Sequence, residues 1–249
     1  MVDRLSFKIN AASILGLAGE SGAGKSSVAR AIMGLLKADS GEVLFKGEDI
    51  LQMNPQQLST TRQKIQLIFQ NPSAGLSPRR SIEQTLLEPL EHFSIGSNSS
   101  RQDKIRQILP SIGLDTDVLR RYPHQFSSGQ QQRIAIARAL VTDPDLLIAD
   151  EAVSALDVSV QAQILQLIQK LQKERGIAVL FISHDLAVIR QIASEVAVIH
   201  RGRLVEHSAA DEFFKQPAHP YSQSLLAFAK NEIPDDMKDQ NWRLNSNRR

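Results

Sequence analysis

The sequence predicts an α/β fold with a mostly parallel sheet and helices on both of its faces. Short apolar runs of strand length recur along the chain, among them Ile14–Ala18, Leu146–Ala149 and Ala178–Ile182. They alternate with segments whose apolar residues recur every three or four positions, as in amphipathic helices. This alternation favours parallel pairing, because each helix carries the chain back to the same end of the sheet.

Further elements follow from the same two spacings. Apolar residues that alternate with polar ones predict half-buried strands at Leu5–Ile9 and Ile65–Phe69. A strand and turn are expected at Val43–Asp49, and a buried strand at Val196–Ile199. Helical spacing predicts two clear helices, one through Val28, Ile32 and Leu36 and one over Val160–Leu171.

The chain of 249 residues is long enough for one large domain with a modest insertion. From Asn71 to about Phe126, prolines, serines and the polar stretch Ser94–Arg101 interrupt helical segments. We therefore predict a helical subdomain at about residues 72–140, inserted in a single domain of residues 1–230. The polar residues 231–249 are expected to form a mobile tail.

Composition excludes several classes of protein. The formal net charge of +2 does not by itself indicate nucleic-acid binding, and the absence of cysteine excludes disulfides, thiolate metal sites and iron–sulfur clusters. No apolar run approaches the roughly 20 residues that cross a bilayer. The N-terminus lacks the long apolar stretch of a signal peptide. The chain is therefore expected to be soluble, and to serve any membrane process through a partner.

The strongest local motif is the run Gly19-Glu20-Ser21-Gly22-Ala23-Gly24-Lys25-Ser26, called the phosphate loop below. It fits the pattern G-x-x-x-x-G-K-[ST] and lies between an expected strand and an expected helix. Glycines let backbone N–H groups wrap a phosphate, and the following helix directs its positive end at the anion. Lys25 would reach the terminal phosphates and the Ser26 hydroxyl would hold Mg²⁺. The motif indicates a nucleotide but not which reaction.

Two carboxylates, Asp150 and Glu151, follow the strand Leu146–Ala149. Ligands of open α/β sheets bind at the carboxyl ends of the strands. Asp150 therefore suits a hold on Mg²⁺, and Glu151 suits polarisation of an attacking water. On these residues alone, an acidic pair that caps the next helix is an equal alternative.

Three further positions are weak signals when taken singly. The signature segment, Ser127–Gln130, precedes an apolar helical run and offers hydroxyls and free N–H groups to an anion. Most such segments are simple helix caps. His184 and Gln70 each follow an expected strand, where a polar residue is more often structural than catalytic.

Taken in their order along the chain, these motifs resemble the ABC ATPase family. The order is the phosphate loop, Gln70, the signature segment, Asp150-Glu151, Ser154–Asp157 and His184, and the resemblance covers about Leu5 to Leu226. It implies a P-loop NTPase core with a mostly parallel sheet, an antiparallel β subdomain and an inserted helical subdomain. It also implies that two such domains hold two ATP molecules between them, head to tail.

The resemblance implies a role for each motif. Ser26, Gln70 and Asp150 approach Mg²⁺, and Gln70 also senses the membrane partner. Glu151 is the general base for ATP hydrolysis and His184 contacts the γ-phosphate. The residues that bind ATP through the phosphate loop and its extension are Gly19, Glu20, Ser21, Gly22, Ala23, Gly24, Lys25, Ser26 and Ser27. The residues that act across the dimer interface are Ser127, Gly129 and Gln130, which touch the other subunit's ATP, and Asp157.

The closer resemblance is to the oligopeptide, dipeptide and nickel importer branch. The stretches that carry it are Gln70-Asn71-Pro72, Leu76–Arg79, Tyr122–Phe126, Ser154–Gln163 and His219-Pro220-Tyr221. It implies an ATPase at the cytoplasmic face of the inner or plasma membrane that powers uptake of peptides, nickel or metal-chelator solutes. The implied partners are two permease subunits, a second ABC ATPase in a heterodimer or homodimer, and an external binding protein that acts indirectly. No nucleic-acid partner is expected.

Three departures from the family pattern bear on activity. Ser128 replaces the usual signature glycine and would crowd the partner's ATP, so an impaired or regulatory ATPase of an unlike pair is the alternative function. Ala152 replaces the usual proline, as in some nickel-type members. No aromatic residue precedes Leu5–Ile9 to stack on adenine, so either adenine is held less tightly or the gene start lies upstream. A non-transport ABC ATPase is a more remote alternative, because the chain lacks the coiled coils, zinc-binding cysteines or second domain of such proteins.

Overall fold

The structure, a computed structural model, describes residues 2–71 and 75–230. The tail predicted for residues 231–249 lies outside the described residues, as does Pro72 of the stretch that resembles the importer branch.

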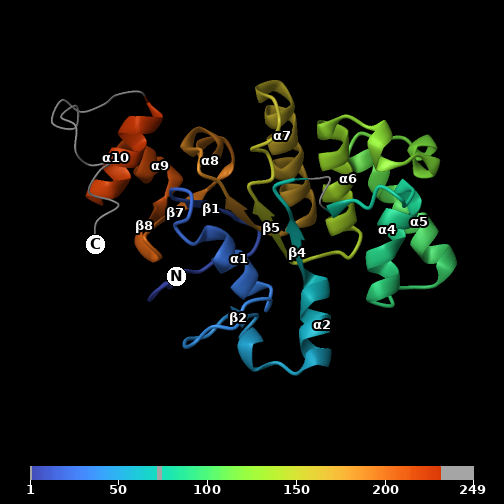
Figure 1. The fold of residues 1–249 in the computed structure, drawn as a ribbon, viewed down its shortest axis with the longest axis horizontal. Coiled ribbons are helices and arrows are strands. Elements are labelled where there is room, and N and C mark those ends of the chain that lie inside the picture. The colour runs from blue at the N-terminus through green and yellow to red at the C-terminus, as the bar shows by residue number, and fades with distance from the viewer. Residues whose placement is uncertain (1, 72–74, 231–249) are drawn as a thin grey trace.

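A six-stranded sheet of order β4-β5-β6-β1-β7-β8 forms the centre of the molecule (Figure 1). The strands from β4 to β7 in this order pair in parallel, and β8 pairs antiparallel with β7 at one edge. Their bounds are β1 (Ile14–Ala18), β4 (Ile65–Ile68), β5 (Leu146–Asp150), β6 (Ala178–Ile182), β7 (Glu195–His200) and β8 (Arg203–Ala209). The predicted mostly parallel sheet is confirmed. Strands β2 (Leu44–Phe45) and β3 (Glu48–Asp49) form a separate antiparallel pair.

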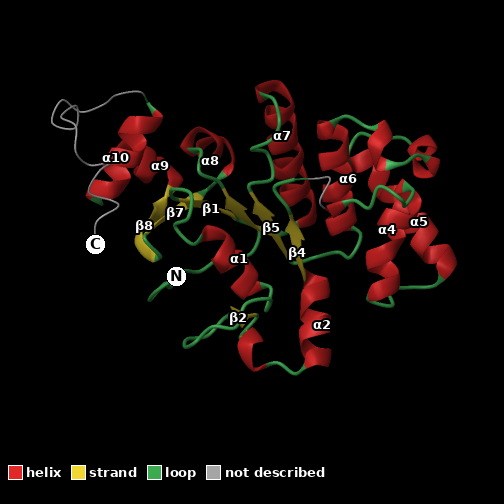
Figure 2. Cartoon of the chain, viewed as in Figure 1, coloured by secondary structure: helices red, strands yellow, loops and turns green. Residues whose placement is uncertain are grey.

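Helices cover both faces of the sheet, with α7 and α8 on one side and α1 on the other (Figure 2). Helices α4, α5 and α6 gather beyond the β4 edge, and all three lie between β4 and β5 in the sequence (Figure 1). The α-helices are α1 (Lys25–Ile32), α2 (Pro55–Lys64), α4 (Ile82–His92), α5 (Asn98–Ser111), α6 (Ser128–Leu140), α7 (Val158–Arg175), α8 (Leu186–Ile192), α9 (Ala210–Lys215) and α10 (Pro220–Ala229). In the described part of the chain, short 3-10 helices form at Ile50–Gln52, Thr116–Arg120 and Pro123–Gln125.

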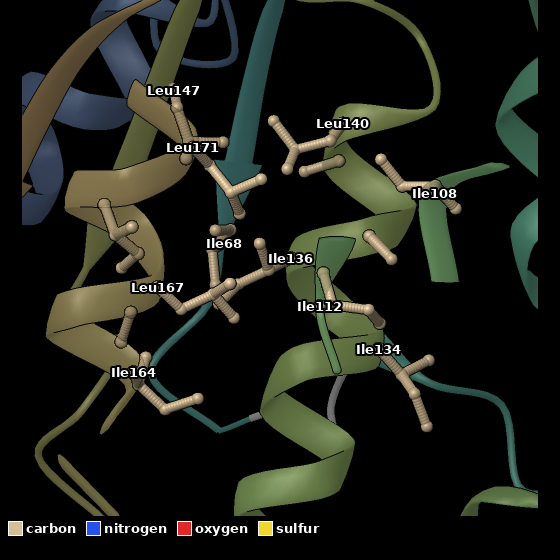
Figure 3. Packing of buried hydrophobic residues seen from close by; sticks show 14 of the residues in the cluster. Ile68, Ile108, Ile112, Ile134, Ile136, Leu140, Leu147, Ile164, Leu167 and Leu171 are labelled. Carbon is tan, nitrogen blue, oxygen red and sulfur yellow. The ribbon is translucent and has the colours of Figure 1, made fainter. Parts of the chain in front are cut away.

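The core divides into clusters on the two faces of the sheet because successive strand residues point to opposite sides. On β5, Leu147 and Ala149 join the cluster of α6 and α7, whereas Leu146 and Ile148 join the cluster that contains Val28 of α1. Figure 3 shows the first cluster, in which side chains of α6 and α7 meet those of β4 and β5. The labelled residues of those elements are Ile68, Ile134, Ile136, Leu140, Leu147, Ile164, Leu167 and Leu171.

The structure corrects two details of the sequence prediction. Leu5–Ile9 is not a strand, although Leu5, Phe7 and Ile9 are half-buried and their polar neighbours are exposed. The alternation therefore reports one-sided contact with the core and not pairing in a sheet. Helix α1 ends at Ile32, and Leu36, assigned to its apolar face, is 46% exposed.

Helix α2 was not predicted, because its sequence has no apolar stripe. Leu58, which packs against the core, is its one apolar residue besides Pro55. The helix begins at a capping box in which the Asn54 side chain accepts the N–H groups of Gln56 and Gln57. Among residues 2–71 and 75–230, no helix combines the length and the apolar character that a membrane crossing requires.

Candidate functional site

The sheet brings the phosphate loop, Asp150-Glu151 and His184 to the edge formed by the carboxyl ends of its parallel strands. Strand β6 lies between β5 and β1, and its Ile182 is level with Asp150 on one side and Leu17 on the other. The chain segments that leave these three strands therefore start side by side. Strand order therefore brings these separately predicted motifs together.

Glycines of the phosphate loop occupy positions that side chains would obstruct. Gly19 has φ 151°, and a Cβ there would lie 2.3 Å from the carbonyl oxygen of Ile199. Gly24 has φ 107°, and its Cβ would lie 2.8 Å from the side chain of Val2. L-residues with side chains rarely adopt such φ values. The loop conformation therefore depends on glycine at both positions.

Lys25 is the cation of the loop. Its Nζ donates to the carbonyl oxygens of Gly19 at 2.8 Å and Glu20 at 2.9 Å, and the residue is only 5% exposed. Burial lowers the pKa of the Lys25 ammonium, and the nearby carboxylates of Glu151, Asp150 and Glu20 oppose that shift. The ammonium lies inside the loop, where it can neutralise a phosphate.

Ser26 and Asp150 meet directly. The Ser26 hydroxyl donates to Asp150 Oδ1 at 3.2 Å. Burial raises the pKa of the Asp150 carboxyl, the Ser26 hydrogen bond opposes the shift, and the charge of Glu151 reinforces it. A cation beside these oxygens would offset the cost of burying the carboxylate.

This pair fits Mg²⁺, which uses one or two protein carboxylates together with water and substrate phosphates. Gln70 follows β4, the neighbour of β5, and its exposed side chain starts at the same edge of the sheet. The described residues contain no group of three or more His, Cys, Asp or Glu residues suited to a metal. A metal held here would therefore rely on a nucleotide for further ligands.

Glu151 and His184 form a second contact at this edge. His184 Nδ1 lies 3.1 Å from Glu151 Oε1, and the Glu151 N–H donates to the Ile182 carbonyl at 3.0 Å. Glu151 has φ 50°, an uncommon value for a residue with a side chain. Its side chain is 19% exposed and that of His184 is 54% exposed. The imidazole orients the carboxylate and keeps its second ring nitrogen for another partner.

The signature segment lies apart from the phosphate loop of the same chain, since α6 packs against α4, α5, α7 and β4 (Figure 1). Ser127 caps α6, where its hydroxyl accepts the Gln130 N–H at 3.3 Å and Gln130 Oε1 accepts the Ser127 N–H at 3.1 Å. Asp157 caps α7 in the same way by accepting the Val160 N–H at 3.0 Å. Ser127, Gln130 and Asp157 each cap a helix in this chain, and their roles toward ATP of a second subunit stay predictions.

Two contacts to the phosphate loop come from residues that the sequence did not connect with it. The Gly202 N–H donates to the Ala23 carbonyl at 3.1 Å from the turn between β7 and β8. The Glu20 N–H donates to the hydroxyl oxygen of Tyr221 in α10 at 3.4 Å. The triplet His219-Pro220-Tyr221 was noted in the sequence for its resemblance to the importer branch. Because it lies far from the phosphate loop in sequence, its contact with Glu20 could not be predicted.

Comparison with known proteins identifies relatives along nearly the whole chain. A family model described as ABC transporter matches residues 2–154. The dipeptide transport ATP-binding protein DppF of Escherichia coli K12 is 46% identical over 238 residues, which are 96% of this chain and 71% of that protein. The oligopeptide transport ATP-binding protein OppF of Streptococcus mutans serotype c is 45% identical over 227 residues, 91% of this chain and 74% of that protein.

Solved structures share the fold. The dimeric bacterial ABC transporter cassette MJ0796 is 29% identical, with a TM-score of 0.74 over 84% of this chain and 90% of that one. CbiO1 of Clostridium perfringens, part of the transporter complex cbiONQ, is 25% identical, with a TM-score of 0.79 over 86% of this chain and 84% of that one.

Proposed function

The chain belongs to the ABC transporter family and is an ABC-type ATPase, and on this premise we propose that it powers an importer of peptides through separate permease subunits. The observation that carries the proposal is the convergence of Lys25, Ser26, Asp150, Glu151 and His184 at one edge of the sheet. The named peptide transporters among its relatives support peptides as the solute.

In the proposed reaction, the phosphate loop binds the phosphates of ATP. Backbone N–H groups at the start of α1 and the Lys25 ammonium neutralise their charge. Lys25 would then exchange the carbonyl oxygens of Gly19 and Glu20 for phosphate oxygens. Ser26, Asp150 and Gln70 would hold Mg²⁺, which would neutralise part of the phosphate charge when bound.

Glu151 is the proposed general base. Its carboxylate would accept a proton from the water that attacks the γ-phosphorus, while the bond from that phosphorus to the leaving oxygen of ADP breaks. His184 would hold the carboxylate through Nδ1 and reach the γ-phosphate through Nε2. The rate enhancement would come mainly from positioning and charge stabilisation.

The proposal includes a second ATPase subunit. Helix α6, which begins at the signature segment, packs against α4, α5, α7 and β4, and Ser127, Gly129 and Gln130 would serve ATP held by a partner. Asp157, exposed at the start of α7, would lie at the interface between the subunits. We assign the helices of residues 72–140 to a subdomain within the ATPase domain of residues 1–230. The assembly would lie at the cytoplasmic face of the membrane.

The test of the proposed base is Glu151→Gln in the assembled transporter, with Glu174→Gln as a matched control. Glu174 is an exposed carboxylate near the end of α7, in a loose ion pair with Lys170 at 3.9 Å. Removing a general base typically costs about 10²–10⁴-fold in rate, so Glu151→Gln should lose turnover by that factor and still bind ATP. Normal turnover in Glu151→Gln would refute the assignment.

The solute is tested by stimulation of ATP turnover in proteoliposomes that contain the chain, its permeases and the external binding protein. Dipeptides and oligopeptides are expected to stimulate turnover, and nickel salts or nickel–chelator complexes are not. Stimulation by nickel alone would replace peptide by metal as the solute and leave the ATPase assignment unaffected.

A second candidate function rests on Ser128, an exposed residue at the first position of α6. Its side chain would face the partner's nucleotide and slow the site to which this chain contributes its signature. Under this alternative, the chain is the regulatory member of an unlike pair. Ser128→Gly in the assembled complex should then raise turnover, and an unchanged rate would count against an impaired signature.

A further inference from the structure

The triplet His219-Pro220-Tyr221 starts helix α10, which Figure 1 shows beside β7 and β8 at the edge of the sheet. His219 caps the helix, because its Nδ1 accepts the Tyr221 N–H at 3.1 Å, and Pro220 is the first helical residue. Proline suits this position because its missing N–H would have no partner within the helix. The first two residues of the triplet therefore fix where Tyr221 stands.

The start of α10 is also anchored to the sheet. The Glu206 carboxylate on β8 accepts the N–H groups of Ala218 at 2.9 Å and His219 at 3.0 Å. Further along the helix, Leu226 packs in a buried cluster that includes Ala18, the last residue of β1. Tyr221 packs against the same cluster. The helix and the strand that leads into the phosphate loop thus share one core.

Tyr221 makes two contacts, one with His200 and one with Glu20 of the phosphate loop. Its ring lies against the imidazole of His200, the last residue of β7, with centroids 3.9 Å apart. Its hydroxyl oxygen accepts the Glu20 N–H at 3.4 Å, which is longer than the usual range of about 2.7–3.2 Å and marks a weak bond. Burial raises the pKa of the Tyr221 hydroxyl and the Glu20 carboxylate acts in the same direction, so the group stays protonated at neutral pH.

We propose that Tyr221 is a positioning residue for ATP, which holds the first part of the phosphate loop through the Glu20 N–H while its ring is fixed by His200. An N–H that is bonded to Tyr221 ties the loop backbone to helix α10. On the other side of the loop, Gly202 bonds to Ala23. The loop is therefore held from α10 and from the β7–β8 turn together. This inference rests on the proposed binding of ATP by the loop.

The test compares Tyr221→Phe, which keeps the ring and removes the hydroxyl, with Tyr221→Leu, which removes both contacts. Phe228→Leu is the matched control, because Phe228 is a partly exposed aromatic residue of the same helix seven positions further on. The readouts are hydrogen exchange of the Glu20 amide in the purified full chain, its ATP affinity, and KM and kcat in the assembled transporter.

In Tyr221→Phe, exchange at Glu20 should rise and ATP affinity should fall about threefold, as expected for one weak neutral hydrogen bond. Tyr221→Leu should lose about tenfold, with the change in KM and not in kcat. Phe228→Leu should match the parent in Glu20 exchange, ATP affinity, KM and kcat. Glu20 exchange and ATP affinity within twofold of the parent in both Tyr221 variants would overturn the proposal. So would an equal loss in Phe228→Leu, since the effect would then come from helix packing.

The outcomes separate this inference from the proposed function. A parent chain that binds ATP, together with Tyr221 variants that bind it equally well, would refute the role of Tyr221 alone. A parent chain that fails to bind ATP would refute the proposed function and this inference with it. Amide exchange at Glu20 tests the contact itself without nucleotide.

Discussion

Gly129 in the signature segment is expected to be required for packing as well as for any contact with ATP. It is buried in the first turn of α6, and a Cβ there would lie 2.4 Å from Cγ1 of Val160 in α7. Two carbon atoms ordinarily lie about 3.5–4.0 Å apart, so the overlap exceeds about 1 Å. Val160 cannot turn away easily, because a β-branched residue in a helix strongly prefers one side-chain rotamer.

The change Gly129→Ala therefore sets two opposing terms against each other. Overpacking costs about 1–3 kcal/mol, whereas alanine gains at most about 1 kcal/mol over glycine in a helix. The net destabilisation should be up to about 2 kcal/mol, and each kcal/mol lowers the melting temperature of a chain of this size by about 2–4 °C. Urea denaturation followed by circular dichroism measures the change.

A double-mutant cycle identifies Val160 as the cause. Val160→Ala alone should cost about 1 kcal/mol, because a half-buried side chain loses two methyl groups. In that background Gly129→Ala should be neutral or stabilising, which gives a coupling free energy of about 1–2 kcal/mol. Ser128→Ala is the control, since this neighbouring side chain is exposed. If Val160→Ala fails to relieve the cost of Gly129→Ala, the packing argument is wrong.

Two further predictions concern stability against pH and are measured as melting temperatures from pH 3 to pH 8. Burial raises the folded-state pKa of Asp150 above its ordinary 3.8, so the folded chain binds this proton more tightly and loses stability as pH rises from 3.8 to the raised pKa. Asp150→Asn should therefore melt higher than the parent at neutral pH, and the difference in melting temperature should close below pH 3.8. An equal or lower melting temperature of Asp150→Asn at pH 7 would contradict this prediction. The Val160 N–H and the Ser159 hydroxyl lower the pKa of Asp157, so the stabilisation of the fold by the Asp157 carboxylate is full above pH 3.8 and is lost as pH falls through the lowered pKa. Asp157→Ala should therefore melt lower than the parent at neutral pH and by less at acidic pH, whereas Asp157→Asn should keep most of the helix cap. A pH-independent difference between Asp157→Ala and the parent would show that the charge is not involved.

Some elements were readable from sequence because local chemistry specifies them. The strand Ile14–Ala18 was predicted with its observed bounds, since a fully buried strand is apolar at every position. The phosphate loop was equally legible, because its glycines and lysine are consecutive. Leu5–Ile9 shows the limit of this kind of reasoning. Alternate burial follows from contact with a core on one side, and only the backbone partners decide whether such a segment is a strand.

The sequence by itself determined the chemical groups of this protein: a loop that wraps phosphate, an acidic pair, a histidine and an amide, in an order that resembles one family. The tertiary structure decided which of them meet. Strand order places Asp150 beside Ser26 and His184 beside Glu151, and leaves the signature segment apart from its own phosphate loop. It also brings Tyr221 to Glu20 across 201 positions of sequence. The physical reason is that a residue type fixes what a side chain can bind, whereas the pairing of strands and the packing of helices fix what it reaches.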